Sequence, residues 1–290
     1  MKHALFRNFW RSAAAIYAAL PLTVALAAGG PEIKFVGATA ASNDLESLQR
    51  GARLFVNHCL NCHGAQFMRY NRLTEIGLTP EQIKKNLMFT TEKIGETMKV
   101  AIDPKDAKEW FGAVPPDLSV IARSYTPERL GAYLRAFYVD ATRETGWNNL
   151  VAPNIGMPHA MAELQGNQTL KESVFKVDGQ NIKTLAEARN QARAAFIASP
   201  TLASFEERVE NREGKTETFY VVRQLVPATD GLLSPQQFDA AMADLVNFMV
   251  YMAEPYRTAR IQIGIVVMLL LGLLLPAVIW LKKEYWKDVT

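Results

Sequence analysis

The spacing of apolar residues along the chain predicts a series of helices. The first begins beside Asn43, which has Glu46 three positions later, the pattern of a helix-capping box. Apolar side chains then recur every three or four residues, the period of one helical face. They are Leu45, Leu48, Ala52, Phe55 and Cys59. The pattern therefore predicts a helix that carries a cysteine at its C-terminal end, and it leaves Gly51 as either a close helix contact or an ordinary helix glycine.

Three further helices are marked by a hydroxyl residue followed by proline, a common helix start. They begin at Thr79-Pro80, Thr126-Pro127 and Ser234-Pro235. The second presents Leu130, Tyr133, Leu134 and Phe137 on one face. The third carries the apolar stripe Phe238, Met242, Leu245, Phe248, Met249 and Met252. We interpret this methionine-rich stripe as core packing rather than as cofactor ligands.

Between these helices the helical period is lost. Residues 89–109 are mixed in character and predict loops. Residues 166–233 are interpreted as an insertion of uncertain structure, in which 174–177 and 219–225 are typical of strands and 185–198 of a helix. The predicted fold class is mainly α with a less regular insertion.

Two apolar runs predict export and anchoring. Residues 1–28 combine a basic start, an apolar run and an Ala-x-Ala cleavage site, as in a secretory signal peptide, with an uncleaved anchor as the alternative. Residues 261–281 are apolar over a length that spans a membrane as one helix, at about 1.5 Å per residue. Lysines follow in the tail, residues 282–290, which is predicted to be cytoplasmic. Residues 29–256 would then lie in the periplasm, held at the bacterial inner (plasma) membrane by a single span.

Composition narrows the classes of function. The chain has 290 residues, enough for one sizeable domain or two small ones. Its formal net charge is only +3, and charges of both signs are interspersed. This balance implies no polyanion partner, and therefore no nucleic acid.

Both cysteines of the chain lie in the pattern Cys59-x-x-Cys62-His63. Two thiols three positions apart can each form a thioether bond with a haem vinyl group, and the adjacent imidazole then reaches the iron as an axial ligand. A zinc site would need further ligands, and a thioredoxin-like dithiol would follow a strand. The neighbouring His58 is interpreted as solvated or supporting. The spacing predicts one covalently bound haem c.

The second axial ligand stays open on spacing alone. Met157 is the best candidate, because Gly156 and Pro158 flank it in a stiff loop that can aim its thioether. His159, Met161 or an open coordination position are the alternatives. Ligation by His63 and Met157 would raise the redox potential relative to two histidines, as suits an electron carrier at the oxidising end of a chain.

Two other features could serve a haem. Pro115 and Pro116 stiffen a segment with aromatic and apolar neighbours, which suits the edge of a flat apolar cofactor and equally a core-lining turn. Arg123 follows shortly after. A guanidinium is a good bidentate partner for a haem propionate, although a lone arginine is more often a solvated surface charge.

In this order, the motifs resemble the cytochrome c1 family, the haem subunits of the cytochrome bc complex (ubiquinol–cytochrome c oxidoreductase). The resemblance rests on the Cys59–His63 motif, Gly112–Ser119, Arg123, the Asn154–Pro158 loop, and Ala253–Pro255 before a single anchor. It implies a class I c-type cytochrome domain with thioether bonds at Cys59 and Cys62 and axial ligands His63 and Met157. It also implies that Pro115 and Pro116 lie against the haem and that Arg123 lies near a propionate. Residues 166–233 match no family motif.

The resemblance also implies a function. The protein would accept one electron from a Rieske iron–sulfur protein and pass it to a c-type cytochrome, with cytochrome b and membrane lipid as further partners. It would have no substrate-converting site of its own. The alternatives are a free-standing anchored cytochrome c, a haem subunit of a terminal oxidase, and a haem-based sensor with an open coordination position.

Overall fold

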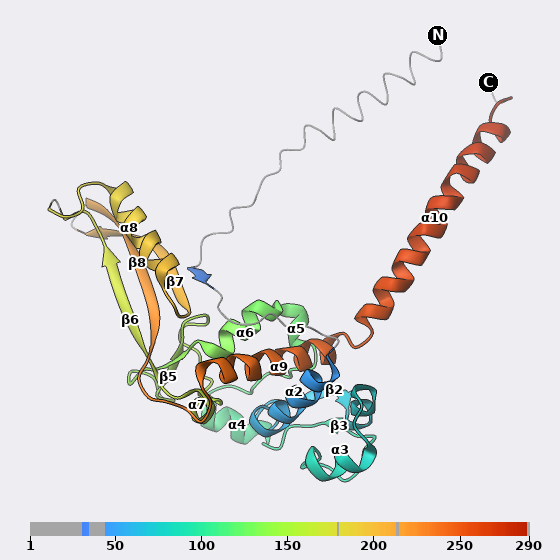
Figure 1. Cartoon of the computed structure of the whole chain (residues 1–290), viewed down its shortest axis with the longest axis horizontal. Helices are drawn as coiled ribbons and strands as arrows, with labels where there is room; N and C mark the ends of the chain where they lie inside the picture. The colour runs from blue at the N-terminus through green and yellow to red at the C-terminus, as the bar shows by residue number, and fades with distance from the viewer. Residues whose placement is uncertain (1–30, 35–43, 179, 213–214, 289–290) are drawn as a thin grey trace. The chain divides into compact units, whose positions relative to one another are not determined.

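A computed structural model describes residues 31–34, 44–178, 180–212 and 215–288. The predicted signal segment, residues 1–28, lies outside them. The chain divides into two compact units, residues 1–32 and 33–290, and the description below concerns the second. The described elements (Figure 1) are β1 (Glu32–Lys34), α2 (Leu45–His58), β2 (Ala65–Arg69), the 3-10 helix η1 (Tyr70–Ile76), α3 (Pro80–Asn86), β3 (Thr97–Met98), α4 (Pro104–Phe111), α5 (Ile121–Ser124), α6 (Pro127–Arg135), β4 (Phe137–Val139), β5 (Trp147–Asn149), α7 (Ala162–Gln165), β6 (Gln168–Phe175), α8 (Leu185–Ala198), β7 (Ala203–Arg212), β8 (Lys215–Pro227), α9 (Pro235–Ala253) and α10 (Arg257–Tyr285).

The main core forms where α2 packs against α9 (Figure 1). The two helices meet at Gly51, where an added Cβ would lie 2.1 Å from the carbonyl oxygen of Asp244. Next to this contact the rings of Phe55 and Phe248 lie 5.6 Å apart between centroids. Gly51 is therefore a close helix contact, the first of the two interpretations. The predicted apolar stripe of α9 is buried along its whole length, which confirms its role in the core.

Polar contacts fix the register of the same two helices. Arg50 donates two hydrogen bonds to the carboxylate of Asp244, at 2.7 and 3.1 Å. The buried side chain of Asn247 donates to Ser47 Oγ at 2.8 Å. Sliding one helix along the other would break both contacts and leave buried polar groups without partners, which is unfavourable.

Helix starts follow the predictions with one correction. Capping boxes form at Thr79–Gln82 and Ser234–Gln237. The cap of α2 is Asp44 rather than Asn43, because the Asp44 carboxylate accepts hydrogen bonds from two amides of the first turn, at 3.1 and 3.3 Å. An anionic cap also suits the positive end of the helix dipole.

Two regions differ from their predictions: a predicted loop contains a short helix, and a predicted helix ends earlier than expected. A short helix, α4, occupies part of the predicted loop 89–109, and Asp103 caps it by accepting from the amide of Lys105 at 2.8 Å. The predicted helix face ending at Phe137 is shorter, because α6 stops at Arg135 and Phe137 begins the β4–β5 hairpin. Phe137 pairs there with Asn149 of β5. The loop that carries Met157 follows this hairpin in the sequence.

The largest correction concerns residues 166–233, which form a regular lobe. Strands β6 and β7 pair antiparallel with β8, and β1 completes a four-stranded sheet in the order β1-β7-β8-β6. The predicted strands 174–177 and 219–225 overlap β6 and β8, and the predicted helix 185–198 is α8. Helix α8 covers one face with a small apolar cluster that includes Phe196, Phe205 and Tyr220. The mainly α prediction therefore holds only in part, and the insertion is an αβ lobe.

Strand β7 was not predicted because its charges resemble a solvated surface in the sequence. In the sheet one of these charges, Glu206, pairs across strands with Arg223 of β8 at 2.6 Å, and Arg223 also contacts Glu172 of β6 at 2.7 Å. Gln168, the first residue of β6, donates to the backbone carbonyls of Arg135 and Phe137. These bonds attach the lobe to the start of the β4–β5 hairpin.

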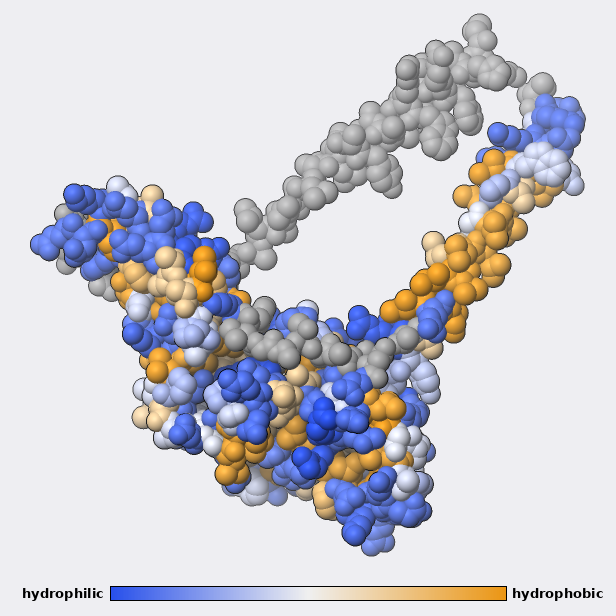
Figure 2. All heavy atoms as spheres, in the orientation of Figure 1, coloured by the Kyte–Doolittle hydropathy of each residue, from blue (hydrophilic) through white to orange (hydrophobic). Residues whose placement is uncertain are grey.

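The C-terminal helix α10 contains the predicted span 261–281. Among the described helices it alone is long and apolar enough to cross a membrane, over Ala259–Tyr285, and none of its most apolar window is buried by the protein. Its apolar side chains form a continuous band with hydrophilic residues at both ends (Figure 2). The helix continues through Pro276. This pattern fits a single membrane anchor.

The Gly51 contact leads to the first prediction. Gly51→Ala places a methyl group inside the van der Waals radius of the α9 backbone, so the two helices must separate. We expect the free energy of unfolding of the purified protein to fall by about 2–3 kcal/mol, the upper range for overpacking, which corresponds to a decrease in Tm of several degrees. Thermal unfolding followed by circular dichroism measures this. Gly95→Ala is the control, because nothing lies within 4 Å of its added Cβ. Equal stability of the two variants would contradict the contact.

Candidate functional site

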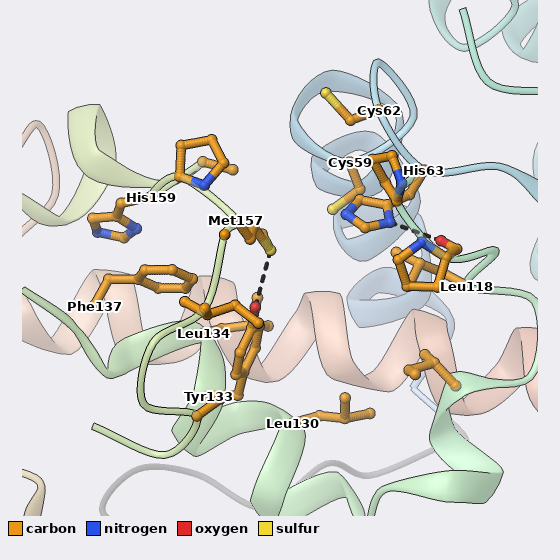
Figure 3. A pocket seen from close by; sticks show the side chains of 18 of the residues that line it. Cys59, Cys62, His63, Leu118, Leu130, Tyr133, Leu134, Phe137, Met157 and His159 are labelled. Carbon is orange, nitrogen blue, oxygen red and sulfur yellow. Dashed lines mark hydrogen bonds between the residues drawn. The ribbon is translucent and has the colours of Figure 1, made fainter. Parts of the chain in front are cut away.

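A cavity of about 390 Å³ lies beside the end of α2. Its two sides come from distant parts of the chain: Cys59, Cys62 and His63 on one side and the Met157 loop on the other (Figure 3). Most of the remaining lining is apolar: Phe111, Ala113, Val114, Pro115, Pro116, Leu118, Ile121, Leu130, Leu134, Phe137, Val151, Ala152, Ile155, Pro158, Ala160, Met161 and Met249. Such a lining favours a flat apolar ligand over a polar one.

The cysteine pair lies in the turn that ends α2. Backbone amides of Cys62 and His63 donate to the carbonyl of Cys59, at 3.1 and 2.8 Å, so the three side chains share one tight turn. Neither cysteine is paired in a disulfide. Burial raises the pKa of Cys59 to about 12 and also raises that of Cys62. The cause is desolvation of both sulfurs, which marks the apolar character of this end of the cavity.

His63 is held in one tautomer. Its Nδ1 lies 2.8 Å from the carbonyl oxygen of Pro116, which can only accept, so Nδ1 carries the proton. The lone pair is then on Nε2. Burial lowers the pKa of His63, while the Pro116 carbonyl and the charge of Asp117 act in the opposite direction. A neutral imidazole with a free Nε2 is the form that binds a metal.

Met157 lies across the cavity from His63 (Figure 3). The hydroxyl of Tyr133 donates to its sulfur at 3.0 Å. Side chains hold the loop that carries it: Asn148 Oδ1 accepts from the amide of Asn154 at 2.8 Å, and Asn149 Oδ1 accepts from the amides of residues 151 and 152. Asn154 itself has a φ of 65°, a left-handed conformation that asparagine tolerates. Met157 is therefore held by side chains as well as by its neighbouring proline.

The two alternative ligands also line the cavity. His159 is 6% exposed and stacks on Phe137 at a centroid distance of 4.9 Å. Burial lowers the pKa of His159 to about 4, so the ring is neutral at physiological pH. Met161 is 2% exposed and belongs to the main core. In Figure 3, His159 lies on the side of Met157 that faces away from His63.

Of the other predicted residues, Pro115 and Pro116 line the cavity. Arg123 is not among the residues that line it, and its guanidinium instead contacts Glu254 at 3.5 Å. Arg129 does line the cavity, with its guanidinium 5.0 Å from the centroid of the Tyr125 ring. His58, interpreted from the sequence as solvated or supporting, is also part of the lining.

The sequence interpretation missed Tyr133 and Arg129 as site residues. Tyr133 was assigned to the apolar face of a helix, and the structure shows that this face lines the cavity. Arg129 lies in the first turn of α6, where a charged residue has no distinguishing signal. No local pattern separates such residues from ordinary helix positions, because their role depends on which helix face meets the cavity.

The donor set fits an iron porphyrin. Two free thiols, an imidazole with a free nitrogen and an opposed thioether surround an apolar space, and these are the groups that attach and ligate haem c. The class of protein that this fold and site define is a membrane-anchored c-type cytochrome.

Comparisons with known proteins agree. The model of the Cytochrome C1 family matches residues 35–178 and 219–289. The chain is 36% identical to cytochrome c1 of Allochromatium vinosum over 95% of its own length and 97% of that protein. It is 37% identical to a protein of Nitrosomonas europaea named ammonia monooxygenase gamma subunit, over 90% and 91% of the two chains. It is 25% identical to cytochrome c1 of Rhodospirillum rubrum, over 85% and 83%.

The chain belongs to the cytochrome c1 family. It binds haem c covalently and is a haem electron-transfer subunit of the cytochrome bc1 complex, which confirms the predicted family and cofactor. The prediction that residues 166–233 match no family motif was wrong in part, because the family model covers 166–178 and 219–233. It leaves out residues 179–218, which include α8 and β7.

Proposed function

We propose that this subunit accepts one electron from a Rieske iron–sulfur protein and passes it to a c-type cytochrome, within the quinol-oxidising complex. The observation that carries the proposal is the arrangement of His63 and Met157 on opposite sides of an apolar cavity, directly beside Cys59 and Cys62. Imidazole and thioether ligation favours a high potential, which suits an acceptor downstream of quinol oxidation.

When bound, haem c supplies a one-electron carrier. The residues of this chain would bind and orient it: Cys59 and Cys62 would form the thioether bonds, and His63 and Met157 would bind the iron from opposite sides of the cavity. Pro115, Pro116 and the apolar lining lie against the ring and exclude water. Excluding water reduces the solvent reorganisation that accompanies a change in the charge of the haem. It also disfavours the oxidised haem, which is the more highly charged form, and so raises the redox potential.

We further propose the membrane arrangement predicted from the sequence. The haem domain, residues 29–256, lies in the periplasm after removal of the signal 1–28. Helix α10 anchors it in the bacterial inner membrane, in contact with lipid and cytochrome b. Residues 282–290 are then cytoplasmic, as the basic residues after the span favour.

One relative has a different name, ammonia monooxygenase gamma subunit. The family match over both parts of the chain, and a cytochrome c1 relative of nearly the same identity, favour the electron-transfer function over an ammonia-oxidising one. A free-standing cytochrome shares the site but lacks the partners, and a sensor has an open coordination position. The next two experiments separate these possibilities.

Co-purification tests the complex. We expect mild detergent extraction of a tagged full-length chain to recover a b-type haem subunit and an iron–sulfur protein in near-equal amounts. Optical spectra of the b haems and electron paramagnetic resonance of the cluster measure this. Recovery of the haem subunit by itself would indicate a free-standing cytochrome, and recovery of an ammonia-oxidising enzyme would support the other description.

Met157→Leu tests the axial ligand. The exchange conserves side-chain volume, so it removes the sulfur with little effect on packing. We expect a lower redox potential, loss of the weak far-red absorption typical of methionine–iron bonding, and carbon monoxide binding by the reduced form. Met161→Leu is the matched control, because it lines the same cavity from the same loop. An unchanged potential in Met157→Leu, or the same changes in Met161→Leu, would exclude Met157.

A cation beside the negatively charged haem propionates would stabilise them. We propose that Arg129, rather than Arg123, is this cation. Arg129 lines the cavity, whereas Arg123 pairs with Glu254. Removing a cation beside a carboxylate favours the oxidised, more positive haem, so Arg129→Gln should lower the potential. Arg123→Gln is the comparison, and redox titration measures both. A decrease confined to Arg123→Gln would restore the original prediction for that residue.

A further inference from the structure

Two short segments lie side by side at the edge of the cavity. Residues 63–67 follow the cysteine pair, and residues 116–119 follow the proline pair. Four hydrogen bonds join the two segments. In two of them a backbone amide of the first segment donates to a side chain of the second, in one the His63 ring contacts a backbone carbonyl, and in one two backbone groups pair. They are His63 Nδ1 to Pro116 O at 2.8 Å, Leu118 N to Gly64 O at 2.8 Å, Gln66 N to Asp117 Oδ2 at 2.8 Å, and Phe67 N to Ser119 Oγ at 3.0 Å.

Asp117 uses both of its oxygens in this arrangement. Oδ2 accepts from Gln66 in the first segment, and Oδ1 accepts from the amide of Ser119 in its own segment, at 2.9 Å. The carboxylate therefore fixes its own loop and also ties that loop to the residues after His63. Gly64 permits the approach, because a Cβ there would lie 3.2 Å from Oδ2.

The carbonyl oxygen that His63 contacts belongs to Pro116, the residue directly before Asp117. That carbonyl shares a peptide plane with the nitrogen of Asp117, so the conformation of Asp117 bears directly on the direction of the carbonyl. Of the residues that follow Pro116, Asp117 is the first with a side chain bonded across to the His63 segment, and the amide of Leu118 adds a backbone bond to Gly64. A partner of this kind normally fixes the tautomer and ring orientation of a histidine ligand.

We infer that Asp117 is a positioning residue for His63: its carboxylate holds the Pro116 carbonyl against Nδ1 and so sets the plane of the imidazole that faces the cavity. This inference deepens the proposed function and rests on His63 being an axial ligand. A backbone carbonyl cannot be replaced by mutation, so the test acts on Asp117, whose carboxylate bonds to both segments.

Asp117→Asn tests the inference in the purified, full-length holoprotein. The amide keeps the size of the carboxylate but presents NH₂ to one of the two amides, so one bond is lost. The g values of a low-spin ferric haem depend on the orientation of its axial ligand planes, and electron paramagnetic resonance reads them directly. We expect a shift in g values while the methionine–iron absorption stays. Asp103→Asn is the matched control, since Asp103 also accepts from a backbone amide, at the start of α4.

A merely structural role would lower Tm and leave the g values unchanged, and that result would overturn the inference. If Asp117→Asn fails to accumulate as holoprotein, Ser119→Ala takes its place, because it removes the Phe67 bond between the same segments. Ser119→Ala should shift the g values in the direction expected for Asp117→Asn, but by a smaller amount. Unchanged g values in Ser119→Ala would also overturn the inference. Absence of histidine–methionine ligation in the wild-type protein would instead refute the proposed function.

Discussion

The site depends on the contact between α2 and α9 at Gly51. The absence of a side chain there lets the two backbones approach, with Asp244 directly opposite. Packing of Phe55 on Phe248 and the Arg50–Asp244 pair then fix how far α2 extends along α9. Because Cys59 follows the last turn of α2, this register decides where the thiols and His63 lie. A single close contact between distant segments thereby places one half of the haem site.

The other half is positioned by a different kind of interaction. The Met157 loop contains no regular element, so side-chain amides of Asn148 and Asn149 replace the hydrogen bonds that a helix or strand would supply. These asparagines belong to the β4–β5 hairpin, which Gln168 of the sheet lobe contacts through backbone carbonyls. The αβ lobe therefore supports the Met157 side of the cavity, although it does not line the cavity itself. Loops held this way can carry functional residues with little motion.

The apolar character of the cavity has electrostatic consequences on both sides. Burial raises the pKa of the Cys59 thiol and lowers the pKa of both His63 and His159. All three groups are therefore uncharged at neutral pH, as desolvation requires. The hydrogen bond from Tyr133 to the Met157 sulfur and the one from His63 to Pro116 orient these two side chains without adding a charge. The site thus presents soft, neutral donors to a flat cofactor.

The sequence by itself determined the local features. The Cys59–His63 spacing, the capping boxes, the α9 stripe and the apolar run of α10 all depend on neighbours within a few residues, so periodicity and motif spacing predict them. For the second axial position it left Met157, His159, Met161 or an open coordination position. The three residues lie within five positions, so spacing alone cannot show which of them faces His63. Only the tertiary structure decided that Arg129 rather than Arg123 lines the cavity, that Tyr133 contacts Met157, and that the charged residues of β7 form a paired sheet. These outcomes depend on contacts between segments far apart in the chain, and such contacts leave no local pattern.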